Sequence, residues 1–448
     1  RPAPQALLLV LAPGLAGAVA MPQLATIYPK EQLAREQAST RHFFWFEMLG
    51  HYAGFVVDTF DHSNFAQSLA RLPQGHDVAD FLAAAPLGGE MRRNIHVVLV
   101  ESLYDVHRFQ GWRFDVDPMT PLFQRWRSLP TATLSLAPTI GSGSPNAEFE
   151  ILCGSPANVD YGETVFLDLQ QDLDCLPRKL SRIGYRTLAT QPLQPSIFSI
   201  GNAYRRLGFG ESHLGDSLDM SDLDAPWELS AQSTLEQHLT FVGQALNTGH
   251  PVFSYVMLTS GHFPFLSDTA RRPHSVTVTP HESTLKDYAN VQHYNMLAIE
   301  DFVAKLRQRD PDGIIAVLGD HAPPLGKRLF QTVGGASQND WEPLLYEIPL
   351  MILDGEAFVQ TGRITHYELP EVLLDLASNG TFCQTQACAK SQPLAARYTP
   401  TGTLVYRRDG PGYRHCGPQD ESADCASYRF RYAATRRQVA RVMGWTWE

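Results

Sequence analysis

NIHVVLVE, residues Asn94–Glu101, is a short apolar run that ends abruptly in a carboxylate. Runs that are apolar throughout are typical of strands buried on both faces of a sheet. Four more runs of this kind follow, at YRTLATQ (Tyr185–Gln191), VFSYVMLTS (Val252–Ser260), GIIAVLGDH (Gly313–His321) and IPLMILD (Ile348–Asp354). This stretch of the chain is therefore predicted to be rich in buried strands.

Helical segments separate these runs. In Thr284–Arg309, the apolar side chains of Val291, Tyr294, Ala298 and Phe302 recur on one face, which predicts an amphipathic helix. Buried strands alternating with helices predict an α/β fold, with a mainly parallel central sheet and helices on both faces. In such sheets, sites form at the carboxyl ends of the strands.

The composition is that of a globular protein with a sizeable core. The chain has 448 residues, of which 44% are hydrophobic and 19% charged, and its formal net charge is −11. Basic residues form no dense cluster before the tail, so nucleic acid is not an expected partner, because such binding needs a concentrated basic face.

The N-terminal part has a different character. The sequence starts at Arg1, and ALLLVLAPGLAGAVAM (Ala6–Met21) is apolar for 16 residues. This is short for a membrane span, which needs about 20 residues, so a signal-peptide core, the end of a truncated span and a buried helix all remain open. We favour a membrane-proximal origin. We divide the chain into a helical, membrane-proximal segment with its linker (1–90), a catalytic domain (91–380) and a small cysteine-containing subdomain (381–448).

The cysteines indicate an oxidising compartment. Their number is even, and no CxxC or HxxxH spacing typical of zinc accompanies them. We predict disulfides between sequence neighbours, namely Cys153–Cys175, Cys383–Cys388 and Cys416–Cys425.

PTIGSGSPNAEFEILCGSP (Pro138–Pro156) holds a candidate nucleophile. Ser144 precedes a proline and a helical run, so it is predicted to cap a helix at its N-terminus. Unpaired N–H groups and the helix dipole favour anions there. A plain capping serine is the alternative.

Three of the predicted strands end in residues that can do chemistry. Together with the turn at Ser144, their loops would present Glu101, His262, Asp320 and His321 at one edge of the sheet. Carboxylates, an imidazole and a hydroxyl suit a divalent cation such as Zn²⁺, Mn²⁺ or Mg²⁺. Such an ion would deprotonate the serine and neutralise charge on a phosphoryl group.

Four segments resemble the signature segments of the alkaline-phosphatase superfamily, in the branch of the lipoteichoic acid synthases and periplasmic phosphoglycerol transferases. They are NIHVVLVES, GSGSPNAEFEILCG, SYVMLTSGHFPF and GIIAVLGDHAPPLG, in the family's order between Asn94 and Leu353. The resemblance implies that Glu101, Ser144, Asp320 and His321 hold the metal and that His262 contacts the phosphate head group. It also implies an extracytoplasmic catalytic domain anchored in the inner membrane.

The sequence departs from this family at the head-group positions. A His, an Asp, an aromatic and an Arg grip glycerol phosphate in the family, and the matching positions are Gln191, Leu193, Phe198 and Ile200. Arg205 and Arg206 are the nearest residues that could compensate. Sulfatase chemistry is not expected, because CLPRK at Cys175 lacks the C-x-P-x-R pattern and follows the nucleophile segment.

The resemblance implies an enzyme that moves a phospholipid head group. Ser144 would attack a phosphodiester, release diacylglycerol and pass the head group to an acceptor hydroxyl, expected on a glycan. Phosphoglycerol from phosphatidylglycerol is the first expectation, and phosphoethanolamine from phosphatidylethanolamine the second. A phosphodiesterase that uses water and a non-catalytic binding protein are the alternatives.

Overall fold

The computed structural model describes most of the chain between residues 93 and 416. The described residues are 93–131, 133–157, 164–167, 169–334, 342–385, 388, 394–399, 402–409 and 412–416. The predicted N-terminal segment and linker (1–90), including Ala6–Met21, lie outside these residues. No helix among the described residues has the length and apolarity needed to cross a membrane.

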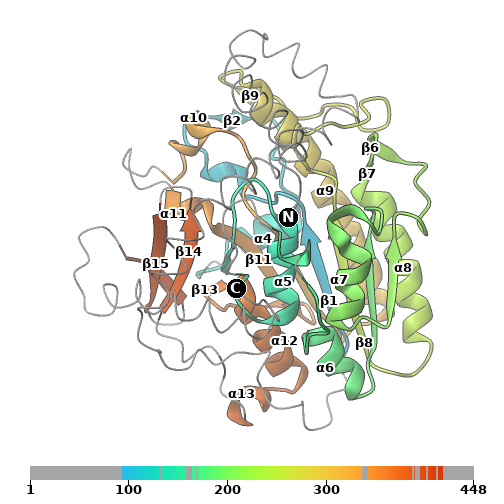
Figure 1. The fold of residues 1–448 in the computed structure, drawn as a ribbon. Coiled ribbons are helices and arrows are strands. Elements are labelled where there is room, and N and C mark those ends of the chain that lie inside the picture. The colour runs from blue at the N-terminus through green and yellow to red at the C-terminus, as the bar shows by residue number, and fades with distance from the viewer. Residues whose placement is uncertain are drawn as a thin grey trace, which may run out of the picture. The chain divides into compact units, whose positions relative to one another are not determined.

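A nine-stranded sheet forms the centre of the fold (Figure 1). Its main path runs β13-β3-β11-β10-β1-β8-β4-β5, and β12 pairs with β11. The five strands from β10 to β5 are parallel to their neighbours: β1 (Ile95–Val100), β4 (Arg186–Gln191), β5 (Glu211–Leu214), β8 (Val252–Leu258) and β10 (Ile314–Gly319). The predicted mainly parallel sheet is confirmed.

The sheet changes direction at β11 (Glu347–Asp354), which runs antiparallel to β10. To run parallel to β10, the next strand would need a crossover connection that returns the chain to the end of the sheet where β10 begins. Between β10 and β11 the chain forms only two four-residue helices among its described residues, α10 (Lys327–Phe330) and α11 (Glu342–Leu345), so β11 starts at the edge where β10 ends. β3 (Leu134–Leu136) and β13 (Arg363–Thr365) complete this side.

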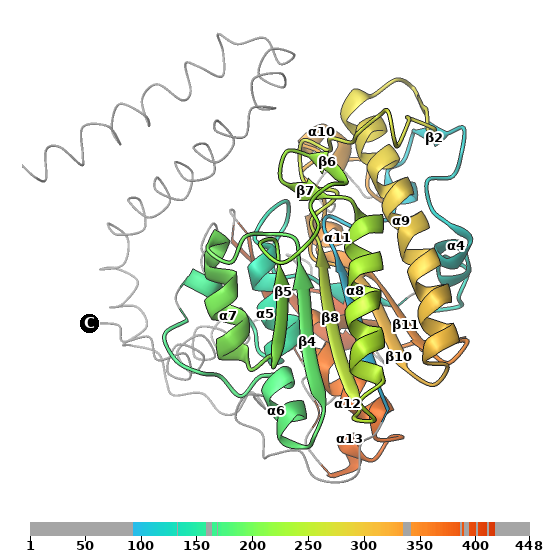
Figure 2. The same ribbon diagram turned by 90° about the vertical axis from the view of Figure 1, so that its right-hand side faces the viewer.

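Alternating side chains of β1 enter two separate cores. Ile95, Val97 and Leu99 pack on one face, whereas Val98 and Val100 pack on the other. The first face is covered by α5 (Ser144–Cys153), α6 (Leu176–Arg182), α7 (Ile200–Leu207) and α12 (Leu369–Ala377). The second is covered by α4 (Pro121–Arg127), α8 (Ala231–Leu246) and α9 (Ser283–Arg309), as Figure 2 shows for α8 and α9.

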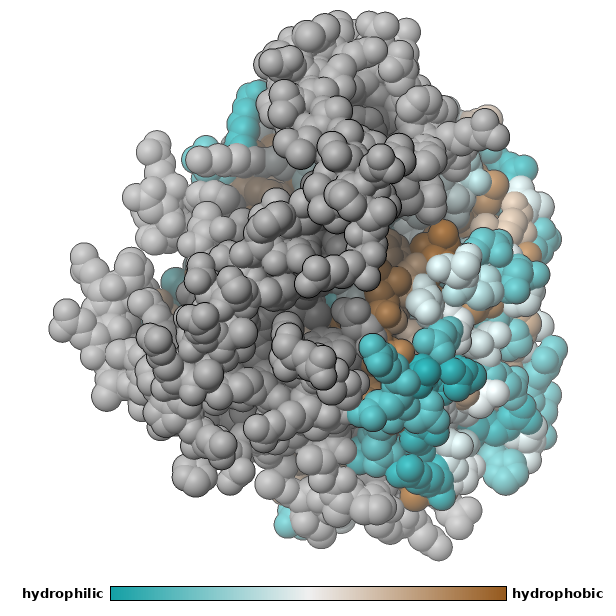
Figure 3. Space-filling model, in the orientation of Figure 1, coloured by the Kyte–Doolittle hydropathy of each residue, from teal (hydrophilic) through white to brown (hydrophobic). Residues whose placement is uncertain are grey.

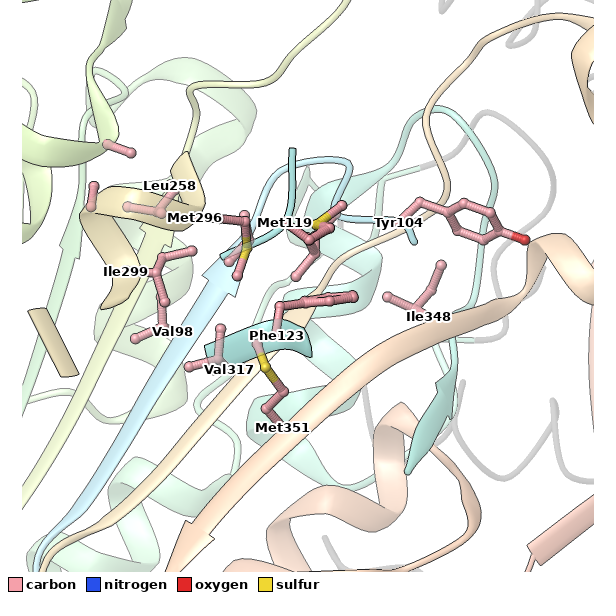
Figure 4. Close-up of a cluster of buried hydrophobic side chains, with 14 of the residues drawn as sticks. Val98, Tyr104, Met119, Phe123, Leu258, Met296, Ile299, Val317, Ile348 and Met351 are labelled. Carbon is pink, nitrogen blue, oxygen red and sulfur yellow. The ribbon is translucent and has the colours of Figure 1, made fainter. Parts of the chain in front are cut away.

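The core under α4 and α9 joins strands and helices that are distant in sequence (Figure 4). Phe123 of α4 lies among Val98, Val317 and Met351, which come from three adjacent strands. In the view of Figure 3, the described residues on the right are mostly hydrophilic, with a hydrophobic group near the middle of the molecule. The predicted amphipathic helix is confirmed as α9, although Tyr294 is only half-buried.

Short elements connect these layers. They are η2 (Val106–Arg108), β2 (Arg113–Phe114), η3 (Val165–Leu167), η4 (Ile197–Ser199), β6 (Leu223–Ala225), β7 (Glu228–Leu229), β9 (Val278–Thr279), β12 (Ala357–Phe358), η5 (His366–Glu368) and α13 (Phe382–Thr385).

Residues 394–415 contain a small antiparallel sheet. It is formed by β14 (Leu394–Thr399), β15 (Gly402–Asp409) and β16 (Gly412–His415). Tyr406 packs against Leu136 of the main sheet and donates a hydrogen bond to the carbonyl of Pro343, and Arg408 forms an ion pair with buried Glu368. This small sheet therefore packs against the part of the chain that carries the main sheet, and the predicted division of the chain into domains stays a prediction.

Candidate functional site

Three chain segments meet at the carboxyl edge of the sheet. β1 ends before Glu101 and β10 ends before Asp320, and these strands are parallel neighbours with Val100 opposite Gly319. The loop before α5 joins them, because the N–H of Gly141 donates to the carbonyl of Ala322 at 2.8 Å. This pairing brings the start of α5 next to the end of β10.

The side chains at this meeting point lie within contact distance of one another. The hydroxyl of Ser144 is 3.3 Å from Oε2 of Glu101 and 3.5 Å from Nε2 of His321. Nε2 of His321 is also 3.3 Å from Oδ2 of Asp320 and 3.7 Å from Oε1 of Glu101. The predicted metal-site residues are thus brought together, with Ser144 partly exposed and the other three buried.

The helix starts one residue earlier than predicted. Gly143 is the N-cap and Ser144 the first helical residue, with Pro145 in the first turn. Gly143 has φ of +84°, a left-handed conformation that glycine adopts without strain. Ser144 therefore does not cap the helix, but its oxygen still stands at the N-terminal end, where the dipole favours negative charge.

Asp320 is held by the backbone through one oxygen. Oδ1 accepts hydrogen bonds from the N–H groups of Ser102 at 2.8 Å and His321 at 2.7 Å. Oδ2 is buried without a hydrogen-bond partner among the described residues. A buried carboxylate oxygen without a partner is costly, so this atom is suited to a cation.

His321 is oriented by a hydrogen bond at the other side of its ring. Nδ1 lies 3.1 Å from the carbonyl of Ala322, which can only accept, so Nδ1 carries the proton. Nε2 then offers its lone pair to the group of carboxylates. A histidine that binds a metal through one ring nitrogen usually donates a hydrogen bond from the other ring nitrogen in this way.

Glu101, Asp320 and His321 fit a divalent cation. One ligand atom from each lies within 4.8 Å of the others, and all three side chains are buried. Burial, followed by the charge of Asp320, raises the pKa of Glu101 to about 8. Two buried carboxylates and an imidazole, beside a hydroxyl, form a donor set that suits Zn²⁺ or Mn²⁺.

Ser102 contributes to this arrangement in a way that the sequence did not predict. It has φ of +55°, which is strained for serine, and its hydroxyl donates to Oε1 of Glu101 at 2.7 Å. The phenol of Tyr288 on α9 donates to the carbonyl of Ser102 at 2.7 Å. Ser102 therefore orients both carboxylates, because its hydroxyl donates to Glu101 and its backbone N–H donates to Asp320.

His262 lies where predicted, just beyond β8, which neighbours β1. Its Nδ1 contacts the carbonyl of Phe263 at 2.7 Å, and its ring centroid is 5.0 Å from that of Trp227 in an edge-to-face arrangement. The ring is partly exposed. The predicted contact with the phosphate head group stays a prediction.

The predicted head-group residues divide into two kinds. Phe198 is partly exposed in the loop after β4 and has φ of +48°. Gln191 is buried, and its amide nitrogen lies 3.5 Å from Glu148 while its amide oxygen lies 2.5 Å from the phenol oxygen of Tyr204. Gln191 thus supports the nucleophile helix, and its predicted role in substrate binding is untested.

Arg205 and Arg206 are not brought to the site. They occupy the last turn of α7, which returns the chain to the start of β5, the opposite edge of the sheet. Each lies 3.8 Å from Asp172, and each donates a hydrogen bond to Asn202. Their predicted compensation for the lost head-group residues receives no support from this position.

Two of the three predicted disulfides are present. Cys153 is bonded to Cys175, and Cys383 to Cys388. Cys425 lies outside the described residues, so the pair with Cys416 stays a prediction. Because Cys175 is in a disulfide, it is not available as the modified cysteine of a sulfatase.

A parallel sheet that presents a helix-borne nucleophile beside Glu, Asp and His side chains defines the alkaline-phosphatase-like class of proteins. The family model described as Sulfatase matches residues 93–379. The chain therefore belongs to the sulfatase family, and its fold is that of the lipoteichoic acid synthase branch, as the resemblance implied.

Solved structures share this fold at low sequence identity. The lipoteichoic acid synthase LtaP from Listeria monocytogenes is 15% identical with a TM-score of 0.62, covering 86% of this chain and 97% of its own. A protein of the alkaline phosphatase superfamily from Vibrio parahaemolyticus is 15% identical with a TM-score of 0.58, covering 85% and 95%. The phosphoglycerol transferase GacH from Streptococcus pyogenes, in complex with sn-glycerol-1-phosphate, is 16% identical with a TM-score of 0.53, covering 85% and 90%.

One curated relative is similar in sequence. A Rhizobium meliloti (strain 1021) protein named for cyclic beta-1,2-glucan modification is 24% identical over 289 residues, which cover 60% of this chain and 44% of that protein. The chain therefore spans less than half of the length of this relative.

Proposed function

We propose that this protein is a metal-dependent phosphotransferase that acts outside the cytoplasmic membrane and moves a phospholipid head group to a glycan hydroxyl. The observation that carries the proposal is the partly exposed hydroxyl of Ser144 at a helix N-terminus, within 3.5 Å of both Glu101 and His321. A location outside the membrane is supported by the two disulfides, which persist in oxidising compartments.

Glu101, Ser144, Asp320 and His321 would hold the divalent ion, expected to be Mn²⁺, Zn²⁺ or Mg²⁺. When bound, the ion lowers the pKa of the serine hydroxyl and neutralises charge on the phosphoryl group. Burial of Glu101, Asp320 and His321 excludes water from the inner side of the site, and the partly exposed Ser144 receives the substrate from the open side.

The chemistry then proceeds in two displacements. Ser144 loses its proton, its Oγ bonds to phosphorus, and the bond from phosphorus to the diacylglycerol oxygen breaks as that oxygen takes a proton. An acceptor hydroxyl next loses its proton and bonds to phosphorus, and the Oγ–phosphorus bond breaks as Oγ takes a proton, which restores the serine. His262, partly exposed at the neighbouring strand end, would bind the phosphate oxygens or give the leaving oxygen its proton.

The identity of the head group has two candidates. Relatives named as lipoteichoic acid synthase and phosphoglycerol transferase share the fold, which supports phosphoglycerol. Leu193 and Ile200 offer no charge at the head-group positions, and Arg205 and Arg206 lie in the last turn of α7 beside Asp172, so phosphoethanolamine is supported as the second candidate. The name of the Rhizobium meliloti relative supports a glycan acceptor.

The test is to supply phosphatidylglycerol and phosphatidylethanolamine, each labelled in the head group, to the metal-loaded full chain. The proposal expects diacylglycerol release and a head-group adduct on the peptide that contains Ser144, seen by mass spectrometry. Ser144→Ala should abolish both. Turnover in the alanine variant, or a label that never reaches Ser144, contradicts the mechanism, and transfer to water alone identifies a phosphodiesterase.

A further inference from the structure

Glu228 is a buried carboxylate that the proposed chemistry does not use. It belongs to β7, which pairs with β6 in a small hairpin placed between β5 and α8 in the chain. The residue is 1% exposed, and neither Oε1 nor Oε2 has a hydrogen-bond partner among the described residues. An acid in this state is destabilising unless something binds it, because burial penalises an unpaired charge.

The carboxylate of Glu228 lies close to the site. Burial, and then the charges of Glu101 and Asp224, raise its pKa well above the usual range. The backbone N–H of Gly261, next to His262, faces it without reaching hydrogen-bond geometry. The preceding residue, Trp227, packs its ring against that of His262. Glu228 therefore adjoins the loop that carries His262, and Gly261 of this loop lies against the carbonyl of Glu101.

The hairpin is fixed in this position by its own ion pairs. Arg272 binds Asp222 at 3.1 Å and Asp224 at 2.5 Å, and the hydroxyl of Ser260 donates to Asp224 at 3.0 Å. The hydroxyl of Ser230, at the other end of the hairpin, donates to Asp222 at 2.5 Å. Asp222 and Asp224 thus have partners, whereas the described residues provide none for Glu228.

Glu228 is not one of the compact group of metal ligands, which consists of Glu101, Asp320 and His321. A metal ion at that group balances the charges of Glu101 and Asp320 but gives Glu228 no partner. In its ionised form, Glu228 requires a second positive charge located beside the phosphate position. Glycerol hydroxyls can donate hydrogen bonds, but they bring no charge.

We infer that Glu228 binds the ammonium group of the donor lipid's head group and so selects phosphoethanolamine over phosphoglycerol. The inference rests on the proposed function, and it turns its second candidate for the head group into the preferred one. A hydrogen bond between an ammonium group and a carboxylate is stronger than one between neutral groups. At a buried carboxylate, it favours a head group with an ammonium over one with only hydroxyls.

The direct test measures binding of soluble head groups to the Mn²⁺-loaded full chain carrying Ser144→Ala, by calorimetry. O-phosphoethanolamine should bind more tightly than sn-glycerol 1-phosphate. Adding Glu228→Gln should weaken O-phosphoethanolamine by about tenfold to a hundredfold and change sn-glycerol 1-phosphate by less than about threefold. Glu236→Gln, an exposed acid on α8, is the matched control and should change neither. Equal effects on the two probes, tighter binding of the glycerol probe, or no binding of either overturns the inference.

Two further measurements separate this role from other uses of the carboxylate. Glu228→Gln should keep or raise the melting temperature, because it removes an unpaired buried acid, whereas a lower melting temperature would make Glu228 a structural residue. Metal analysis should find one equivalent of Mn²⁺ with and without the substitution. Loss of a second equivalent would make Glu228 a metal ligand instead, and either of these results overturns the inference.

Failure of the proposed function would look different. If neither labelled lipid modifies Ser144, the phosphotransferase proposal fails whatever Glu228 does. If both lipids modify Ser144 equally and Glu228→Gln leaves their ratio unchanged, the phosphotransferase proposal holds and the assignment of Glu228 fails.

Discussion

Asp320 shows at the scale of one residue how the fold prepares a cation site. Two backbone N–H groups fix Oδ1, so the orientation of the carboxylate does not depend on a bound ion. Oδ2 is then left without a partner among the described residues, next to Nε2 of His321 at 3.3 Å. The backbone N–H groups donate to Oδ1 of the carboxylate, and Oδ2 is available to bind a metal ion.

We therefore predict that Asp320→Asn weakens Mn²⁺ binding by at least about a hundredfold while the fold is kept, because the amide replaces a charged ligand but can still accept both backbone hydrogen bonds. Calorimetric titration of Mn²⁺ measures the affinity, and circular dichroism checks the fold. Unchanged Mn²⁺ affinity in this variant would remove Asp320 from the ligand set.

His238 leads to a prediction about acid stability that is independent of the site. Its ring is buried, and Nδ1 contacts Thr190 at 2.8 Å while Nε2 contacts Ser254 at 3.3 Å. Burial, with the nearby charges of His96 and His213, lowers the pKa of His238 to about 3. The unfolded chain takes up this proton near pH 6.5 but the folded chain does not, so the unfolded state binds more protons between these values.

The stability contribution of His238 is accordingly complete above pH 6.5 and is lost as the pH falls toward 3, by up to about 1.4 kcal/mol per pH unit. His238→Asn should flatten the dependence of the unfolding free energy on pH in this range, measured by urea denaturation at several pH values. His250→Asn, at an exposed position, should leave the slope as in the wild type. An unchanged slope in His238→Asn would show that another group carries the acid sensitivity.

The residues that the sequence revealed and those that it did not differ in a physical way. Glu101, Asp320 and His262 follow long apolar runs, so the rule about strand ends located them. Ser102 was missed as a positioning residue because its left-handed backbone depends on the contact with Tyr288, far along the chain. Glu228 was missed because β7 has only two residues, too short for any periodic pattern.

At the scale of elements, α5 depends on its attachment to α6. The disulfide joins Cys153 in the last turn of α5 to Cys175, the N-cap of α6, across a sequence separation of 22. Glu148 in the middle of α5 receives hydrogen bonds from Tyr204 of α7 at 2.5 Å and Tyr255 of β8 at 3.0 Å. The helix that carries Ser144 is thus fixed at its end and along its buried face.

We predict that replacing both Cys153 and Cys175 by alanine lowers the free energy of unfolding by about 3 kcal/mol, because the crosslink no longer restricts the unfolded chain. The matched control replaces Cys383 and Cys388, which close a separation of only five residues, and should cost about 2 kcal/mol. Chemical denaturation measures both. A larger loss in the control pair would contradict the role given to the first disulfide.

The element that the sequence described least well was β11. Its apolar run correctly predicted a buried strand, but the run carries no information on direction. Direction was decided by the connection from β10, whose described part has no helix long enough to cross the sheet. The same limit applies to β14, β15 and β16, because they lie in a region that its cysteines, glycines and polar residues had marked as loop-like.

At the scale of the whole molecule, the fold brings together acidic side chains from distant parts of the chain, and their negative charges repel one another. Glu101 follows β1 and Asp320 follows β10, so two acidic side chains converge in a buried region, and Glu228 of the β6–β7 hairpin feels the charge of Glu101. The two packed cores hold these elements together against that repulsion. A cation at the site should therefore stabilise the entire fold, because it binds the folded chain and not the unfolded one.

We predict that Mn²⁺ at one hundred times its dissociation constant raises the free energy of unfolding by about 2.7 kcal/mol relative to protein stripped with a chelator. At one fixed Mn²⁺ concentration the effect should be greater at pH 8 than at pH 6, because the metal-free pKa of Glu101 is about 8 and binding at lower pH must displace its proton. Melting curves with and without Mn²⁺ at both pH values test this. Asp320→Asn should reduce the response to about 0.4 kcal/mol or less, and Glu236→Gln should retain it. A response that is larger at pH 6, or that keeps its full size in Asp320→Asn, would mean that the stabilising ion binds elsewhere.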